Sequence, residues 1–352
     1  MVPDKVHLVG SIALASVEEV FRTVGKTLGR RLRRVPDGEP GSRRMWISYQ
    51  YPFLRTQPFL KPDPSIQNPR GFPPLMLDES FAMVDIQFSE LGYAREARIS
   101  YQDFLAAKQT GHIPPGTRFQ VALPTPMAVC GPFISPKDET VVENIYGRAM
   151  LREVETICRV IPYADLCIQW DVCIEMLLWD GRWPTMQHLA AGTSDLLGEI
   201  MPRMRRIGEA VPEPVELGFH LCYGDLDAKH FVEPVDAAKM VEMANALVTT
   251  VRRSITYIHM PVPIDRSDDA YFRPLANLKL KPETELYLGL VHADGVEATQ
   301  KRIAAASKYV ADFGIATECG IARSRTPELV KKLLEIHAGA SREPVQVAEA
   351  RT

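Results

Sequence analysis

Three residues in two distant segments have the types and spacing of ligands for a soft metal ion. His220 and Cys222 stand two apart at the end of the apolar run 217–221, and residues two apart in a β-strand point to the same side. A second apolar run, 313–316, ends three residues before Cys319. An imidazole and two thiols at two strand ends predict a zinc site. The sequence has no CxxC pair of the kind that usually builds a closed structural site.

Zinc held by one imidazole and two thiolates, with one position open, binds an incoming thiol and keeps it ionised near neutral pH. Methyl or alkyl transfer to sulfur is the chemistry that such a site favours, and dealkylation of a thioether is the reverse of it. The sequence therefore predicts a zinc-dependent methyl- or alkyltransferase that activates a small polar thiol as a zinc thiolate. Its partners would be that thiol and a methyl or alkyl donor.

The elements that must position these residues alternate along the chain. The apolar periodicity predicts strands at 6–9, 32–35, 117–123, 165–171, 216–221, 255–259, 285–290 and 314–317, and helices at 16–24, 100–108, 141–161, 192–209, 235–249, 295–310 and 326–337. About eight strand–helix units predict an α/β fold, a single (β/α)8 TIM barrel over residues 1–340 with long loops on its C-terminal face. We expect the polar stretch 341–352 to be a disordered tail.

The proline-rich stretch 49–74 interrupts this alternation. It contains seven prolines and no periodicity, so we expect a long excursion over the barrel face that shapes a substrate pocket or its lid.

Polar residues follow nearly every predicted strand, at the end where barrels carry function. They are Ser11, Asp37, Thr125, Asp171, His220 with Cys222, His259, His292, and Glu318 with Cys319. Asp171 would hold a substrate amine or alcohol, or else support a neighbour or cap a helix. Glu175 belongs to the same site or is a solvated helix acid. His259 is either a metal ligand or a substrate contact, and Asp294 either borders the site or caps the helix after it.

These motifs resemble the catalytic, carboxyl-terminal barrel of cobalamin-independent methionine synthase, within the uroporphyrinogen decarboxylase and methionine synthase-like superfamily. That family holds zinc through a His-x-Cys pair and a later Cys-Gly, which implies His220, Cys222 and Cys319 as metal ligands. Val9-Gly10-Ser11, Asp171 with Glu175, and His292 are similar to further family positions. We expect catalytic roles for Asp171, His259 and His292, and substrate-binding roles for Ser11, Asp37, Asp171, Glu175, His259 and His292.

The chain departs from the family pattern at the fourth ligand. The family uses a glutamate at the strand end between the two cysteine motifs, where this chain has Tyr257-Ile258-His259-Met260-Pro261. Either His259 replaces the glutamate, or water or the substrate thiolate fills the position. The family's amino-terminal barrel and folate-binding segments have no counterpart here, so the resemblance does not imply folate-dependent methionine synthesis.

Two other functions remain open. Metal-free decarboxylases of the same superfamily bind polycarboxylates, and here Asp37 and the arginine-rich loop 31–44 would do this work. Four of its arginines, Arg33, Arg34, Arg43 and Arg44, either bind an anion or form local ion pairs. Alternatively, the barrel and its zinc would serve as a non-catalytic binding protein.

The composition narrows the possible partners. With 41 basic and 44 acidic residues, the formal charge is −3, so we expect neither nucleic-acid nor membrane binding. The chain has no run of eighteen apolar residues and no signal-peptide pattern, which favours a cytoplasmic protein. The remaining cysteines, Cys130, Cys158, Cys167 and Cys173, lie in apolar runs and are predicted to be reduced packing residues. His230 with Glu233 is either a surface pair or part of a site. The sequence gives no indication of oligomeric state.

Overall fold

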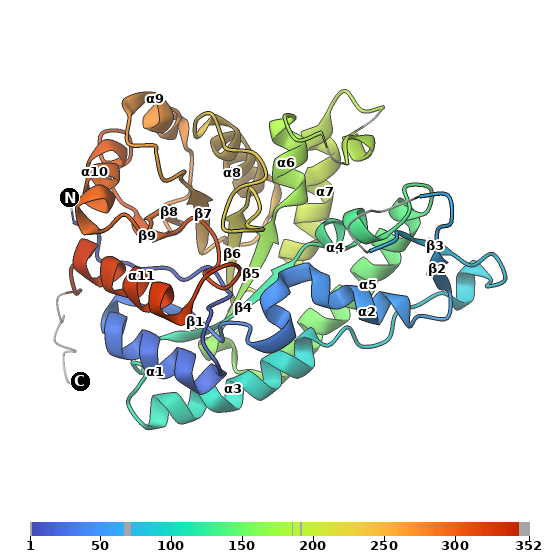
Figure 1. Ribbon diagram of the computed structural model, residues 1–352, viewed down its shortest axis with the longest axis horizontal. Coiled ribbons are helices and arrows are strands. Elements are labelled where there is room, and N and C mark those ends of the chain that lie inside the picture. The colour runs from blue at the N-terminus through green and yellow to red at the C-terminus, as the bar shows by residue number, and fades with distance from the viewer. Residues whose placement is uncertain (1, 67–71, 185, 191, 345–352) are drawn as a thin grey trace.

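The computed structural model describes residues 2–66, 72–184, 186–190 and 192–344, and at its centre is a curved parallel sheet (Figure 1). Its strands follow in the order β1 (Arg34–Pro36), β4 (Arg118–Pro124), β5 (Leu166–Val172), β6 (Glu216–Leu221), β7 (Tyr257–Pro261), β8 (Glu285–Val291) and β9 (Gly314–Thr317). Each strand is parallel to its neighbour. The strands are almost fully buried, as expected for a sheet covered on both faces.

The sheet closes into a barrel through the segment near the amino end of the chain, which forms isolated bridges at Val6 and at Ile12. Val6 forms parallel bridges to Leu32, two residues before β1, and to Ile315 in β9. The Val6 amide donates to the Arg31 carbonyl at 3.0 Å, and the His7 amide donates to the Ile315 carbonyl at 2.9 Å. The strand predicted at 6–9 is thus a single bridging residue that completes an eightfold barrel. The predicted α/β barrel class is confirmed.

The longer helices of the described residues surround this sheet (Figure 1). They are α1 (Val17–Leu28), α3 (Tyr93–Gln109), α5 (Glu139–Val160), α7 (Leu196–Glu209), α8 (Ala238–Thr250), α10 (Val296–Ala306) and α11 (Pro327–Ala340). The first begins as its sequence predicts, since the Ser16 hydroxyl accepts a hydrogen bond from the Glu19 amide. Its residues Val20, Phe21 and Val24 are buried against the barrel core.

The helices that sequence periodicity missed are short, and periodicity is weak over one or two turns. They are α2 (Gln50–Arg55), α4 (Pro126–Phe133), α6 (Ile174–Asp180) and α9 (Asp269–Phe272). Residues 29–31, 41–49, 83–85, 163–165, 187–190 and 273–277 form 3-10 turns.

The proline-rich excursion has more regular structure than its sequence suggested. It contains α2 and β2 (Leu60–Pro62), and β2 pairs in an antiparallel manner with β3 (Leu75–Leu77) beyond it. Figure 1 shows this pair beside α4 and α5, away from the central sheet. Buried Leu60 and Leu75 anchor it, and the Ser135 amide donates to the Leu75 carbonyl at 2.7 Å. Residues 67–71 of the excursion lie outside the described residues.

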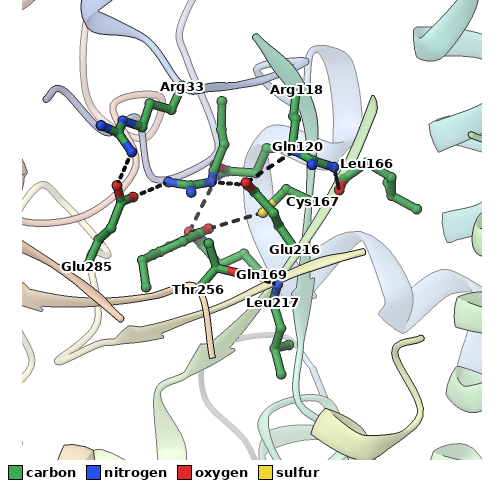
Figure 2. A network of polar contacts seen from close by, with 12 residues as sticks. Arg33, Arg118, Gln120, Leu166, Cys167, Gln169, Glu216, Leu217, Thr256 and Glu285 are labelled. Atoms are coloured by element: carbon green, nitrogen blue, oxygen red, sulfur yellow. Dashed lines mark hydrogen bonds and ion pairs between the residues drawn. The ribbon is translucent and has the colours of Figure 1, made fainter. Parts of the chain in front are cut away.

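A network of ion pairs occupies the amino end of the barrel (Figure 2). Arg34, only 3% exposed, pairs with Glu216 and with Glu285, the first residues of β6 and β8. Arg33 also pairs with Glu285, and Arg118 pairs with Glu216 at 3.1 Å. All these residues stand at strand starts, opposite the end where barrel enzymes bind substrates. The sequence left open whether the arginines of this loop bind an anion or form local ion pairs. Arg33 and Arg34 form ion pairs.

The described carboxyl-terminal residues pack against the beginning of the chain. The Arg342 amide donates to the Pro3 carbonyl at 2.9 Å, and Glu343 pairs with Arg31 at 3.2 Å. The rest of the predicted tail, 345–352, lies outside the described residues. Within the part of the chain that is described, no helix combines the length and apolarity needed to cross a membrane.

Candidate metal centre and adjoining cavity

The three predicted metal ligands meet at the carboxyl ends of β6 and β9. The ligand atoms of His220, Cys222 and Cys319 all lie within 4.8 Å of one another, and all three side chains are buried. The two Sγ atoms are 3.8 Å apart. Two thiolates bound to tetrahedral zinc at about 2.3 Å are about 3.8 Å apart, whereas disulfide sulfurs are about 2.05 Å apart. The cluster therefore has the spacing of a zinc site.

The parallel register explains why His220 has a second histidine beside it. Asp171 of β5 pairs with His220 of β6, and His220 pairs with His259 of β7. In-register residues on adjacent strands point to the same face, so these three side chains form one row inside the barrel mouth. Nδ1 of His220 lies 2.7 Å from Nδ1 of His259.

The hydrogen-bond partners of His220 and His259 show which ring nitrogens carry protons. Nε2 of His259 lies 3.1 Å from the Thr317 carbonyl, which only accepts hydrogen bonds, so this nitrogen carries a proton. Burial lowers the pKa of His259 to about 3 and that of His220 well below its ordinary value, so both rings are neutral. His259 Nδ1 is then an acceptor and His220 Nδ1 donates to it. His220 Nε2 keeps its lone pair, and it is buried without a hydrogen-bond partner.

That orphaned nitrogen is the atom that a metal ion would complete. A buried polar atom without a partner is costly, and His220 Nε2 is the only unassigned nitrogen of the ring. Both nitrogens of His259, by contrast, are already bound to other groups. In this geometry His259 is placed to orient His220, and it would have to give up one of these hydrogen bonds to serve as the fourth ligand.

The thiols of the cluster are held in their protonated form unless a metal replaces the protons. A hydrogen bond with Cys173 raises the pKa of Cys222, and a hydrogen bond with Cys222 raises the pKa of Cys319. The backbone amide of Gly224 also lies 3.3 Å from the Cys222 sulfur. Because zinc must displace thiol protons, the affinity of this site for zinc should decrease as the pH is lowered.

An arginine that the sequence analysis missed ties the two ligand loops together. Arg323, four residues after Cys319, donates through Nε to the Asp225 carbonyl at 2.9 Å, and its Nη2 lies 3.9 Å from the Cys319 sulfur. Arg325 binds the Asp225 carboxylate at 2.9 Å. Asp225 follows Cys222 by three residues, so its contacts with Arg323 and Arg325 fix the distance between the two cysteine loops. Arg323 also places a positive charge beside the thiols.

A cavity of about 620 Å³ lies directly above the cluster. His220, Cys222 and Cys319 all line it, so the open position of a bound metal would face it. Two predicted substrate contacts, Ser11 and Asp171, line it as well. An added Cβ at Gly320 would come within 2.3 Å of the Ser11 hydroxyl. The Cys-Gly sequence therefore permits the close packing that brings Ser11 to the cavity floor.

Two carboxyl groups on this cavity share an environment that favours their neutral forms. Burial raises the pKa of Asp171 to about 7, while a 2.8 Å hydrogen bond from Gln169 acts in the opposite direction. Burial and the charge of Asp171 raise the pKa of Glu39 to about 8. Sequence reasoning did not identify Glu39, which lies in a loop and has a φ of 51°.

Backbone strain also gathers at this cavity. The lining residues Glu39, Trp46 and Met186 have φ values of 51°, 51° and 64°, a region that residues with a side chain rarely adopt. Such strain concentrates at ligand sites because the surrounding structure must hold it. Trp46 and Met186 lacked any signal in the sequence.

No protein-family model and no curated protein matches the sequence. Solved structures with the same fold exist. A putative vitamin-B12-independent methionine synthase from Listeria monocytogenes superposes with a TM-score of 0.59 at 13% identity, over 97% of this chain and 98% of that one. A B12-independent methionine synthase from a Shewanella species, in complex with selenomethionine, superposes with a TM-score of 0.59 at 15% identity, over 97% of each chain. The chain has the fold of these B12-independent methionine synthases.

Four further residues predicted to contact the substrate do not line the cavity: Asp37, Glu175, His259 and His292. Asp37 accepts from the Ser100 hydroxyl at 2.7 Å and pairs with Arg43 at 2.8 Å, so it faces α3. Glu175 borders a separate cavity of about 40 Å³ between helices, with Glu143 and Arg203 among its lining residues.

His292 also points away from the cavity. Its Nε2 lies 2.9 Å from the Val262 carbonyl, and its Nδ1 lies 3.9 Å from Glu318. His230 pairs with Glu233 at 2.8 Å and lies 3.6 Å from the same Glu318, so it belongs to this second group of charges. Asp294 pairs with Arg302 and does not cap α10.

The remaining predictions concern Arg44, the other four cysteines and the proline-rich excursion. Arg44 donates to the Leu14 carbonyl at 3.0 Å, so, like Arg33, Arg34 and Arg43, it has an internal partner. Cys130, Cys158, Cys167 and Cys173 are buried free thiols. The excursion predicted to shape the pocket contributes Phe72 to the cavity lining.

Proposed function

We propose that this chain is a zinc-dependent S-alkyltransferase that binds a thiol and alkylates it, with methyl the simplest group transferred. The observation that carries the proposal is the unpartnered Nε2 of His220, buried beside two thiols 3.8 Å apart at the floor of a cavity. Three protein ligands and one open position are the pattern of catalytic zinc sites. Zinc in such a site supplies ionisation of a bound thiol near neutral pH.

The protein's own residues would orient the site and compensate its charge. His259 keeps His220 in the tautomer whose Nε2 is free, and Arg323 places a positive charge 3.9 Å from Cys319. Two thiolates and a substrate thiolate exceed the charge of Zn²⁺ by one negative unit. The Arg323 guanidinium offsets this excess in a buried setting, where charge interactions are strong.

The Glu39 and Asp171 carboxyls suit proton transfer at the same cavity. With a pKa of about 7, Asp171 is partly ionised near neutral pH and can accept the thiol proton, while Glu39, with a pKa of about 8, is mostly protonated there and can donate one. In the transfer step the sulfur–carbon bond forms while the bond from that carbon to the donor's leaving atom breaks, and the leaving atom keeps the electron pair. The same carboxyls would hold a basic group of the substrate. The selenoether seen in the Shewanella structure supports a sulfur-containing substrate.

The alternatives differ in what supports them. Dealkylation of a thioether uses the same groups in the reverse direction. We do not propose a decarboxylase, because Arg33, Arg34, Arg43 and Arg44 all have internal partners. We further infer a cytoplasmic location, since all six cysteines are free thiols.

Turnover tests the proposal against a non-catalytic receptor. The zinc-loaded protein is incubated with a panel of thiols and methyl donors, and thioether formation is followed by mass spectrometry. We expect turnover that disappears in His220→Ala and Cys319→Ser and persists in Cys158→Ser, a buried cysteine outside the cluster. Turnover that survives removal of zinc would contradict the proposal. Binding of thiols without any thioether would favour the receptor.

A further inference from the structure

The cavity above the metal cluster is larger and more apolar than a small polar thiol requires. Its volume of about 620 Å³ lies within the range of about 300–1,000 Å³ in which drug-sized ligands bind. The polar lining consists of the cluster itself with Ser11, Glu39, Ser48, Asp171, Asp225 and Arg323. The rest of the lining is formed by large apolar side chains, including Trp46, Ile47, Phe133, Ile174, Trp183, Met186 and Phe231.

Apolar side chains are also exposed where this cavity opens. Four of its lining residues are large and solvent-exposed: Met45 (48%), Phe72 (38%), Leu226 (44%) and Phe231 (41%). They come from three segments far apart in the sequence, the 3-10 turn before α2, the excursion, and the loop after β6. Exposed apolar groups that converge on one opening mark a binding surface, because covering them is favourable.

One wall of the cavity is an aromatic pair close to a metal ligand. The rings of Trp183 and Phe231 are nearly parallel, at 9°, with centroids 5.6 Å apart. Phe231 lies against Gly224, where an added Cβ would come within 2.4 Å of the ring. Gly224 is two residues from Cys222 and its amide contacts the Cys222 sulfur. A group attached to a sulfur at the metal would therefore meet this aromatic wall.

We propose that the substrate carries a large apolar group, an aryl or aralkyl substituent, on or near its sulfur, and that the wall formed by Trp183 and Phe231 binds it. This inference rests on the proposed function and gives its substrate class. It replaces the small polar thiol expected from the sequence with an aromatic thiol or thioether. Aromatic groups prefer offset or edge contacts with rings at this spacing, and the cavity has room for such a group beside the cluster.

Matched probes separate the sulfur from the apolar group. Benzyl mercaptan carries both, 2-mercaptoethanol carries only the thiol, and benzyl alcohol carries only the ring. Binding to the zinc-loaded protein is measured by titration calorimetry. We expect benzyl mercaptan to bind at least about tenfold more tightly than 2-mercaptoethanol, a difference of about 1.4 kcal/mol. Benzyl alcohol should bind weakly.

Substitutions then locate the apolar contact. Phe231→Ala should weaken the binding of benzyl mercaptan about tenfold and leave the affinity for 2-mercaptoethanol unchanged. Phe81→Ala, an equally exposed phenylalanine that does not line the cavity, should change neither. Zinc content shows whether each variant is intact, and Phe72→Ala provides a second cavity variant if Phe231→Ala does not fold.

The possible failures are distinguishable. Equal affinity for the two thiols, or equal weakening of both by Phe231→Ala, would overturn the substrate class and leave the proposed function standing. If benzyl alcohol binds as tightly as benzyl mercaptan and 2-mercaptoethanol does not bind, the aromatic wall stands and the thiol chemistry fails.

Discussion

Nδ1 of His259 lies 2.7 Å from Nδ1 of His220 and accepts a hydrogen bond from it, which leaves the other nitrogen of His220 free for a metal ion. The chain of contacts runs from the Thr317 carbonyl through His259 to His220. Thr317 is the last residue of β9 and stands two residues before Cys319. The segment that carries the Cys319 thiol therefore also sets the tautomer of the His220 imidazole.

Replacing His259 should weaken zinc binding without changing the ligand set. Removing the hydrogen-bond partner of a metal-bound histidine costs roughly 10–100-fold in metal affinity, so we expect this loss in His259→Phe. Competition with a chelator measures the affinity. His337→Phe, a buried histidine that hydrogen-bonds the Leu333 carbonyl within α11, is the control. If His259 were itself a ligand, zinc-edge absorption of the variant would show one nitrogen fewer.

The carboxyl pair should make the protein less stable as pH rises. The pKa of Asp171 rises from 3.8 to about 7 in the folded chain and that of Glu39 from 4.5 to about 8. A carboxyl whose folded pKa is raised binds more protons in the folded state between the two values. Its stabilising contribution is full below about pH 4 and is lost as pH rises through 7 to 8.

Thermal unfolding of the chelator-treated protein at pH 5 and pH 8 checks this dependence, since zinc affinity itself varies with pH. The drop in Tm between the two values should be smaller in Asp171→Asn and in Glu39→Gln than in the unchanged chain. Glu297→Gln, an exposed helix acid, should leave the drop as it is. An undiminished drop in both cavity variants would refute the assignment.

The ion pairs at the amino end of the barrel should contribute to stability and not to metal binding. Arg34→Leu leaves Glu216 and Glu285 without their shared buried partner, and removing one member of a buried pair costs about 3–5 kcal/mol. Urea denaturation measures the free energy of unfolding. Zinc content should stay the same because the network lies at the opposite end of the strands. Arg30→Ala, on an exposed side chain, is the control, and an equal effect of both changes would disprove the role of Arg34.

The barrel and the cluster of His220, Cys222 and Cys319 were predictable because both depend on local sequence. Strand and helix periods alternate along the chain, and the carboxyl ends of parallel strands converge. His220, Cys222 and Cys319 follow from these two facts. The single-residue bridge at Val6 was not predictable as such, since its pairing with Leu32 and Ile315 depends on how the whole barrel closes.

The direction of a side chain beyond a strand end could not be predicted from sequence. Asp37 lies one residue after β1 and turns outward to Ser100 of α3, and Glu175 lies within α6 and faces the helix layer. Glu39 reaches the cavity only because its backbone adopts a positive φ. Arg323 is brought to the cluster by its partner Asp225, almost a hundred residues earlier. Such contacts depend on loop conformations that no sequence period encodes.

X-ray absorption at the zinc edge of the purified protein tests the central claim most directly. We predict about one zinc per chain, bound by two sulfurs at about 2.3 Å and one nitrogen at about 2.0 Å. One further light ligand should be replaced by a third sulfur when benzyl mercaptan is added. Cys222→Ser and Cys319→Ser should each lose the metal. A protein that folds without binding zinc, or a site with four protein ligands that added thiols leave unchanged, would contradict the account.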